Sequence, residues 1–148
     1  MANVCDVAAY ILKQSGAMTA WKLQKLVYYS QAWSLVWDQR PMFGEPIQAW
    51  ANGPVCPTLY NKHRGRFMVS EIPGDPSNLD VDAQETIDGV LSFYGDKHPQ
   101  WLSDLTHSES PWKDARGGLP AGANSSQEIT LEAMAAYYES LEPGGELD

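Results

Sequence analysis

Residues 23–37 read LQKLVYYSQAWSLVW, and they predict a helix that is apolar or aromatic on almost every side. At about 100° of rotation per residue, only a narrow strip around Gln24 and Gln31 stays polar. A helix that is apolar nearly all round is normally covered by several neighbouring elements. We therefore expect this segment, capped at Thr19 and ending near Asp38, to be the central helix of the fold.

The rest of the chain alternates short helical patterns with turn residues. One short alternating run, Ile47 to Trp50, fits a strand of a small hairpin. These patterns predict a mainly α (α+β) fold, a compact single domain of about six helices around a central aromatic-rich helix with a small β-hairpin. The domain is expected to span residues 1–141, and residues 142–148 (EPGGELD) are expected to form a flexible acidic tail.

Two groups of residues are expected to serve the structure. The large apolar residues of the central helix should lie in the core, because such side chains are usually buried: Leu23, Leu26, Trp33 and Trp37. Asn52, Gly53 and Pro54 predict a turn, since Asn and Gly tolerate positive φ. Pro54 also suits the first turn of a short helix that follows.

The net charge of −9 is unevenly distributed. Residues 1–66 hold seven Lys and Arg against three Asp and Glu, whereas residues 67–148 hold three against sixteen. No nucleic-acid partner is expected, because phosphate binding needs a basic face. The acidic part fits a basic protein partner better than nucleic acid, although most acidic surfaces serve solubility alone. With neither a long apolar run nor an export signal, the chain is expected to be cytoplasmic, without a membrane span.

Residue types that carry catalysis or bind metals are present but scattered. Cys56 and His63 would lie about two helical turns apart, too far for a direct nucleophile–base contact. His98 and His107 lack the short paired spacing of zinc ligands, and Glu109 is expected at a solvated helix end. We therefore predict no catalytic residue, no cofactor and no metal. A hydrolase or transferase using Cys56 or the histidines stays open as an alternative.

Residues 22–60 carry a more specific pattern. KLQKLVYYSQAWSLVW, followed by PMFGEPIQAWANGPVCPTLY, resembles the hallmark region of the Panacea domain, the SocA-like antitoxin family. The resemblance implies a mainly helical domain with a small β element, encoded beside a toxin in bacteria, phages or mobile elements. It also implies neutralisation of that toxin by protein–protein binding. The SocA branch is linked in addition to delivering a bound toxin to a protease.

The expected function is therefore that of a non-enzymatic antitoxin that binds a cognate toxin encoded by an adjacent gene. The alternative is a proteolytic adaptor that delivers a toxin to a AAA+ protease. If the toxin is basic, the acidic second part of the chain predicts salt-sensitive association. Because aromatic residues and arginines dominate interface energetics, the candidate partner-binding residues are Tyr28, Gln31, Trp50, Tyr60, Lys62, Arg64 and Arg66.

Overall fold

The computed structural model describes residues 2–120 and 122–141, and within them it contains seven α-helices, one 3-10 helix and five short strands. The helices are α1 (Val4–Ser15), α2 (Ala20–Trp37), α3 (Pro57–His63), η1 (Pro76–Asn78), α4 (Val81–Tyr94), α5 (Pro99–Ser108), α6 (Ser110–Ala115) and α7 (Leu131–Leu141). The strands are β1 (Met18–Thr19), β2 (Ile47–Trp50), β3 (Gly53–Val55), β4 (Met68–Val69) and β5 (Glu128–Ile129). The mainly helical α+β fold is confirmed. The predicted tail, residues 142–148, lies outside the described residues.

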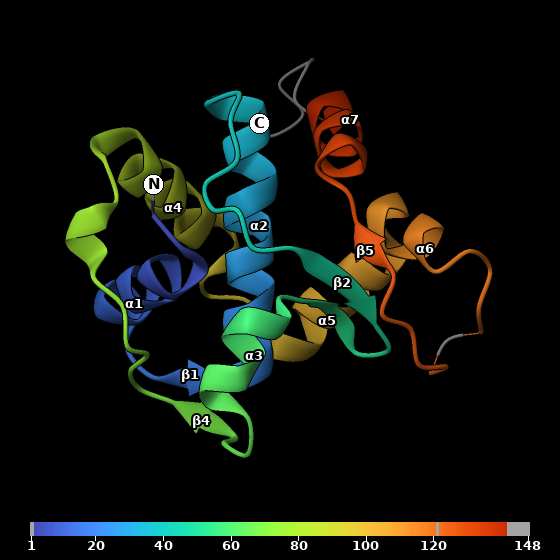
Figure 1. Cartoon of the computed structure of the whole chain (residues 1–148), viewed down its shortest axis with the longest axis horizontal. Coiled ribbons are helices and arrows are strands. Elements are labelled where there is room, and N and C mark those ends of the chain that lie inside the picture. The colour runs from blue at the N-terminus through green and yellow to red at the C-terminus, as the bar shows by residue number, and fades with distance from the viewer. Residues whose placement is uncertain (1, 121, 142–148) are drawn as a thin grey trace.

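Helix α2 is the centre of the fold. It packs against α1, α4, α5 and α7, and Figure 1 shows α1 and α4 on one side of it and α7 on the other. Its first turn is fixed by Thr19, whose Oγ1 accepts a hydrogen bond from the Lys22 N–H at 3.1 Å. Among the described residues, none of the helices has both the length and the apolar character needed to cross a membrane.

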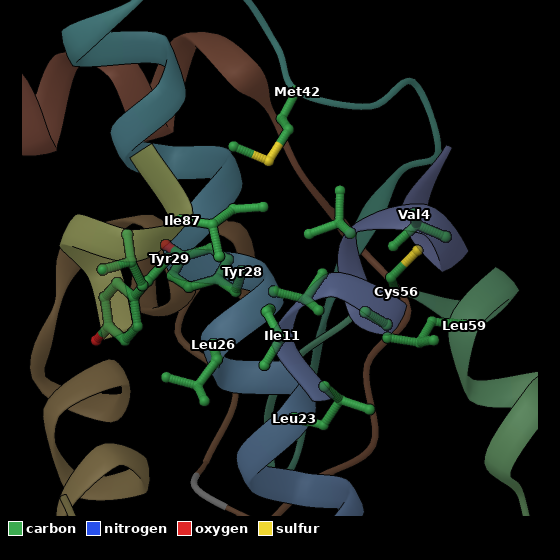
Figure 2. Close-up of a cluster of buried hydrophobic side chains, with 14 of the residues drawn as sticks. Val4, Ile11, Leu23, Leu26, Tyr28, Tyr29, Met42, Cys56, Leu59 and Ile87 are labelled. Atoms are coloured by element: carbon green, nitrogen blue, oxygen red, sulfur yellow. The ribbon is translucent and has the colours of Figure 1, made fainter. Parts of the chain in front are cut away.

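The core is built where α1 lies against the first half of α2. Val4 and Ile11 of α1 pack with Leu23 and Leu26 of α2, and all four side chains are fully buried (Figure 2). Leu59 of α3 belongs to the same buried cluster. Buried apolar residues from α1 through α7 form one continuous cluster, so α2 is covered on several sides, as its sequence predicts.

The last turn of α2 differs from the sequence expectation. Leu23, Leu26 and Trp33 are buried, but Trp37, also expected in the core, is 39% exposed. Its ring stacks on the ring of Trp33 with a centroid separation of 5.0 Å, so it covers the core rather than entering it. This position follows from its place as the final residue of the helix.

The polar strip predicted on α2 does not face solvent. Gln24 and Gln31 are both 1% exposed. Gln31 Oε1 accepts from the Met42 N–H at 2.7 Å, and Gln31 Nε2 donates to the Phe43 carbonyl at 2.8 Å. Gln24 Oε1 accepts from the Cys56 N–H at 2.9 Å. Both amides thus satisfy backbone groups of segments that follow α2, which is how a buried polar side chain avoids its desolvation penalty.

Two small antiparallel sheets complete the fold. In the first, β2 pairs with β3 across a two-residue turn at Ala51 and Asn52, which confirms the predicted hairpin. β2 is the middle strand rather than an edge strand, because β5 pairs with its other side. Pro54 lies in the edge strand β3, where prolines are tolerated, and it is Pro57 that opens α3. The second sheet, β1 with β4, was not predicted, because two-residue strands are too short to show a pattern.

Candidate partner-binding site

Two of the predicted partner-binding residues meet a third aromatic residue at the start of α2. The ring centroids of Trp50 and Tyr60 lie 5.0 Å apart in an edge-on arrangement, and that of Trp21 lies 6.4 Å from Tyr60. All three side chains are partly exposed. Together with Lys25 they form what we call the open cluster. It joins α2, β2 and α3, which sequence reasoning treated as separate elements.

Lys25 forms the floor of the open cluster. Its side chain is 2% exposed, and its Nζ donates to the Asn52 carbonyl at 3.0 Å and lies 5.9 Å from the centre of the Trp21 ring. Gly53 makes room for it, because a Cβ at that position would approach Lys25 Cε to 2.9 Å. Gly53 also has φ of +124°, which side chains rarely adopt. The Asn52-Gly53 turn therefore both closes the hairpin and covers the lysine.

Within the described part of the chain, no carboxylate compensates the charge of the Lys25 ammonium group. The salt bridges among the described residues do not include Lys25, and burial lowers its pKa to about 8. A buried lysine with only a carbonyl partner is unfavourable, because the charged form loses its hydration without gaining a counter-ion. Sequence reasoning missed this residue, since nothing in the local pattern distinguishes Lys25 from an exposed lysine.

The basic segment continues α3 beyond Tyr60. Lys62, Arg64 and Arg66 are all exposed, and Arg66 Nη2 donates to the Lys62 carbonyl at 3.0 Å, which holds the segment in a compact turn. Lys62 lies in the last helical turn, where a cation interacts favourably with the negative end of the helix dipole. These cations are therefore accessible to a partner near the aromatic residues.

Tyr28 and Gln31, the other two candidates, do not reach the surface. Each is 1% exposed, and Gln31 is occupied by the backbone after α2 as described above. The Tyr28 hydroxyl lies 3.0 Å from the hydroxyl of Tyr138 in α7. In this fold neither side chain faces solvent, because α7 and the segment after α2 cover them.

Tyr28 instead belongs to a second aromatic group, which we call the closed cluster. It consists of buried aromatic residues around one carboxylate, Glu109, and none of the rings is more than 6% exposed: Tyr28, Tyr29, Trp33, Tyr94 and Tyr138. Tyr29 and Tyr138 both donate hydroxyl hydrogen bonds to Glu109 Oε1, at 2.8 and 2.6 Å. Since Tyr138 uses its proton there, Tyr28 is the donor to Tyr138.

The position of Glu109 also differs from the sequence prediction. It was expected at a solvated helix end, but its side chain is 4% exposed and turns inward instead of capping α6. Burial raises its pKa to about 7, and the hydrogen bonds from Tyr138 and Tyr29 oppose that rise. The surrounding tyrosines could not be connected to this residue from the sequence, because they come from α2, α4 and α7.

The open alternative of a Cys–His enzyme gains no support from the geometry. Gln24 Nε2, rather than the Cys56 thiol, is the hydrogen-bond partner of the His63 ring, at 2.9 Å. Burial raises the pKa of the Cys56 thiol to about 11 and lowers that of His63. An activated cysteine needs the opposite shift in its thiol pKa. Within the described residues, His, Cys, Asp and Glu form no group of three that could hold a metal ion.

A comparison with known protein families assigns the chain to one of them. The family model described as antitoxin SocA-like, Panacea domain, matches residues 23–113, more than half of the sequence. The chain belongs to this family. The part matched by the Panacea model includes Lys25, Trp50 and Tyr60 of the open cluster, whereas Trp21 lies just before it. No curated protein and no solved structure matches the chain.

Proposed function

We propose that this Panacea-domain protein is a cytoplasmic, non-enzymatic antitoxin that neutralises a cognate toxin by direct protein–protein binding. The family membership of residues 23–113 is the observation that carries this proposal, because the family description names an antitoxin. The family indicates a protein partner, and the toxin itself is expected to be the product of an adjacent gene.

The open cluster is the surface that we propose for the toxin. Partly exposed Trp and Tyr side chains are the residues that most often contribute large binding energies. Here Trp21, Trp50 and Tyr60 hold one another by ring contacts. Their conformational freedom is therefore already restricted, and less entropy is lost when a partner binds. The exposed cations Lys62, Arg64 and Arg66 begin in the last turn of the helix that carries Tyr60 and continue just beyond it, and they can steer an acidic surface of the toxin toward the open cluster.

The test is co-expression of this protein with the product of the adjacent gene. We expect the neighbour to stop growth alone, to be harmless with the wild-type protein, and to co-purify with it. The double variant Trp50→Ala and Tyr60→Ala should lose both rescue and co-purification. Phe93→Ala, which removes a 51% exposed aromatic residue from α4, is the matched control and should retain both.

Two outcomes would contradict the proposal. A neighbour that is not toxic removes the antitoxin function. Rescue that needs an active cellular protease, without a stable complex, favours the adaptor that delivers a toxin to a AAA+ protease. Rescue by the double variant equal to that of Phe93→Ala would leave the antitoxin function in place and exclude the open cluster as the binding surface.

A further inference from the structure

A pocket beside the open cluster is built around Lys25. Its volume is about 280 Å³, and its wall comes from the start of α2, the hairpin turn and the first turns of α5. The residues that the argument uses are Trp21, Lys25, Asn52, Gln100 and Ser103. Three elements distant in the sequence thus meet around one buried ammonium group.

Lys25 has unused hydrogen-bonding capacity in this pocket. An ammonium group carries three N–H donors. Among the described residues the Asn52 carbonyl is the acceptor that Lys25 Nζ contacts, at 3.0 Å, so donors remain for a ligand. Only 2% of the Lys25 surface is exposed, so a ligand that reaches its ammonium group would bind in a poorly hydrated environment. Electrostatic attraction is stronger there than at an open surface.

The surroundings of Lys25 favour an anion. The pocket includes the N-terminal end of α5, a ten-residue helix whose dipole attracts negative charge. Ser103 also lines the pocket, and its hydroxyl lies 3.3 Å from His107 Nδ1. The nearby carboxylate of Asp104 is exposed and accepts from Gln100 Nε2 at 2.9 Å, and it forms no salt bridge with Lys25. The place of a counter-ion is therefore not taken by the described residues.

We propose that this pocket binds the carboxylate of an Asp or Glu side chain from an acidic segment of a partner protein, with Lys25 as the charged donor and Trp21 as the apolar wall. A carboxylate fits better than a phosphate, because one ammonium balances one negative charge, whereas a phosphate group carries close to two at neutral pH. The inference rests on the proposed function for the nature of the partner, but the pocket can be tested without a toxin.

The test uses two blocked peptides, Gly-Glu-Glu-Gly and Gly-Gln-Gln-Gly, and protein with carbon-13-labelled lysine. The pH titration of the Lys25 ε-carbon signal is followed by NMR at constant ionic strength. The Glu peptide should raise the pKa of Lys25 by about one unit or more, which corresponds to roughly tenfold preference for the charged lysine. The Gln peptide should leave it unchanged.

Two variants separate the pocket from the general charge of the surface. Lys25→Met keeps the length of the side chain without its charge and should weaken binding of the Glu peptide about tenfold or more. Lys22→Met, which removes the partly exposed neighbouring cation of α2, should change binding less than about twofold. Circular dichroism of both variants checks that they are folded.

Three results would overturn the inference: an unchanged Lys25 pKa with the Glu peptide, equal peptide binding by Lys25→Met and wild type, or an equal pKa rise with inorganic phosphate. Failure of the proposed function would give a different experimental result from failure of the pocket. If the Glu peptide binds at Lys25 but the adjacent gene product is not toxic, the pocket stands and the antitoxin role does not.

Discussion

The beginning and the middle of α2 contribute to two aromatic clusters of opposite character. In the closed cluster every ring is buried, and the one carboxylate, Glu109, receives hydrogen bonds from Tyr29 and Tyr138. In the open cluster the rings of Trp50 and Tyr60 are partly exposed, and the cation, Lys25, contacts a carbonyl and the Trp21 ring but no carboxylate among the described residues. The first arrangement completes a core, whereas the second leaves apolar surface and charge without a full set of partners.

From this difference we propose that the closed cluster serves folding and the open cluster serves binding. A chain under selection for stability alone gains by replacing an uncompensated buried charge with an apolar residue. The departure from that rule at Lys25 lies beside the exposed aromatic residues, where a functional site is expected. Net charge alone suggested a basic partner, but the surface that we propose for binding carries Lys25 and the exposed cations after Tyr60, and it fits an acidic segment.

The largest contrast is expected from tyrosine truncation in each cluster. Tyr138→Ala should lower the free energy of unfolding by about 4 kcal/mol, because it removes a buried ring and leaves Glu109 and Tyr28 short of a hydrogen-bond partner. Tyr60→Ala should lower it by less than about 1.5 kcal/mol, since the ring is partly exposed. Urea unfolding followed by circular dichroism measures both. Equal losses would remove the distinction between the clusters.

The buried carboxylate of the closed cluster should make stability depend on pH. The pKa of Glu109 is about 7 in the folded protein against 4.5 for an ordinary glutamate, so between these values the folded state keeps a proton that the unfolded state has lost. Stability therefore falls as pH rises through this window, by on the order of 3 kcal/mol. Glu109→Gln keeps a carbonyl acceptor for both tyrosines and should lack this fall. Unfolding curves of the two proteins from pH 5 to 8 give the difference, and parallel curves would contradict the assignment.

The buried cation of the open cluster should have the opposite pH dependence. The pKa of Lys25 is about 8 in the folded protein against 10.5 for an ordinary lysine. Between these values the unfolded state binds more protons, so stability rises with pH. Lys25→Met should lack this rise and should be more stable at pH 7 by about 2 kcal/mol, after the loss of the hydrogen bond to Asn52. A less stable Lys25→Met protein at pH 7 would show that the lysine supports the fold.

The smallest effect on stability is expected in the basic segment that follows Tyr60, outside the open cluster. Arg64→Ala should change the free energy of unfolding by less than about 0.5 kcal/mol, because the side chain is exposed. It should instead slow association with the toxin and weaken the dependence of the association rate on salt. Stopped-flow measurements at two salt concentrations test this. An unchanged association rate would show that the basic segment does not steer the partner during association.

The elements with strong local patterns could be predicted from the sequence. The apolar run of α2, its cap at Thr19 and the hairpin around Asn52 and Gly53 each depend on neighbouring residues, and each was found where expected. Pro54 shows the limit of such reasoning: it fits a helix start as well as an edge strand, and only strand pairing with Ala49 distinguishes the two.

The site depended on tertiary contacts that the sequence does not display. Helix α2 is apolar on nearly all sides, so its sequence pattern does not predict which of its residues are buried. The tertiary structure buries Tyr28 and Gln31 and leaves Trp21 partly exposed. Lys25 and Glu109 were missed for a related reason. Charged residues are usually exposed, so burial of these two is not expected from their type. The hairpin turn covers Lys25, and tyrosines of α2 and α7 hydrogen-bond to the buried Glu109.

The most direct test of the central claim is the affinity of the purified toxin for Trp50→Ala, with Phe93→Ala as the matched control, measured by calorimetry. If the open cluster binds the toxin, Trp50→Ala should weaken binding by about 30-fold or more, and Phe93→Ala by less than about threefold. Unfolding curves should show both variants to be folded under the conditions of the measurement. Equal affinities for the two variants would contradict the account and move the toxin-binding surface elsewhere on the molecule.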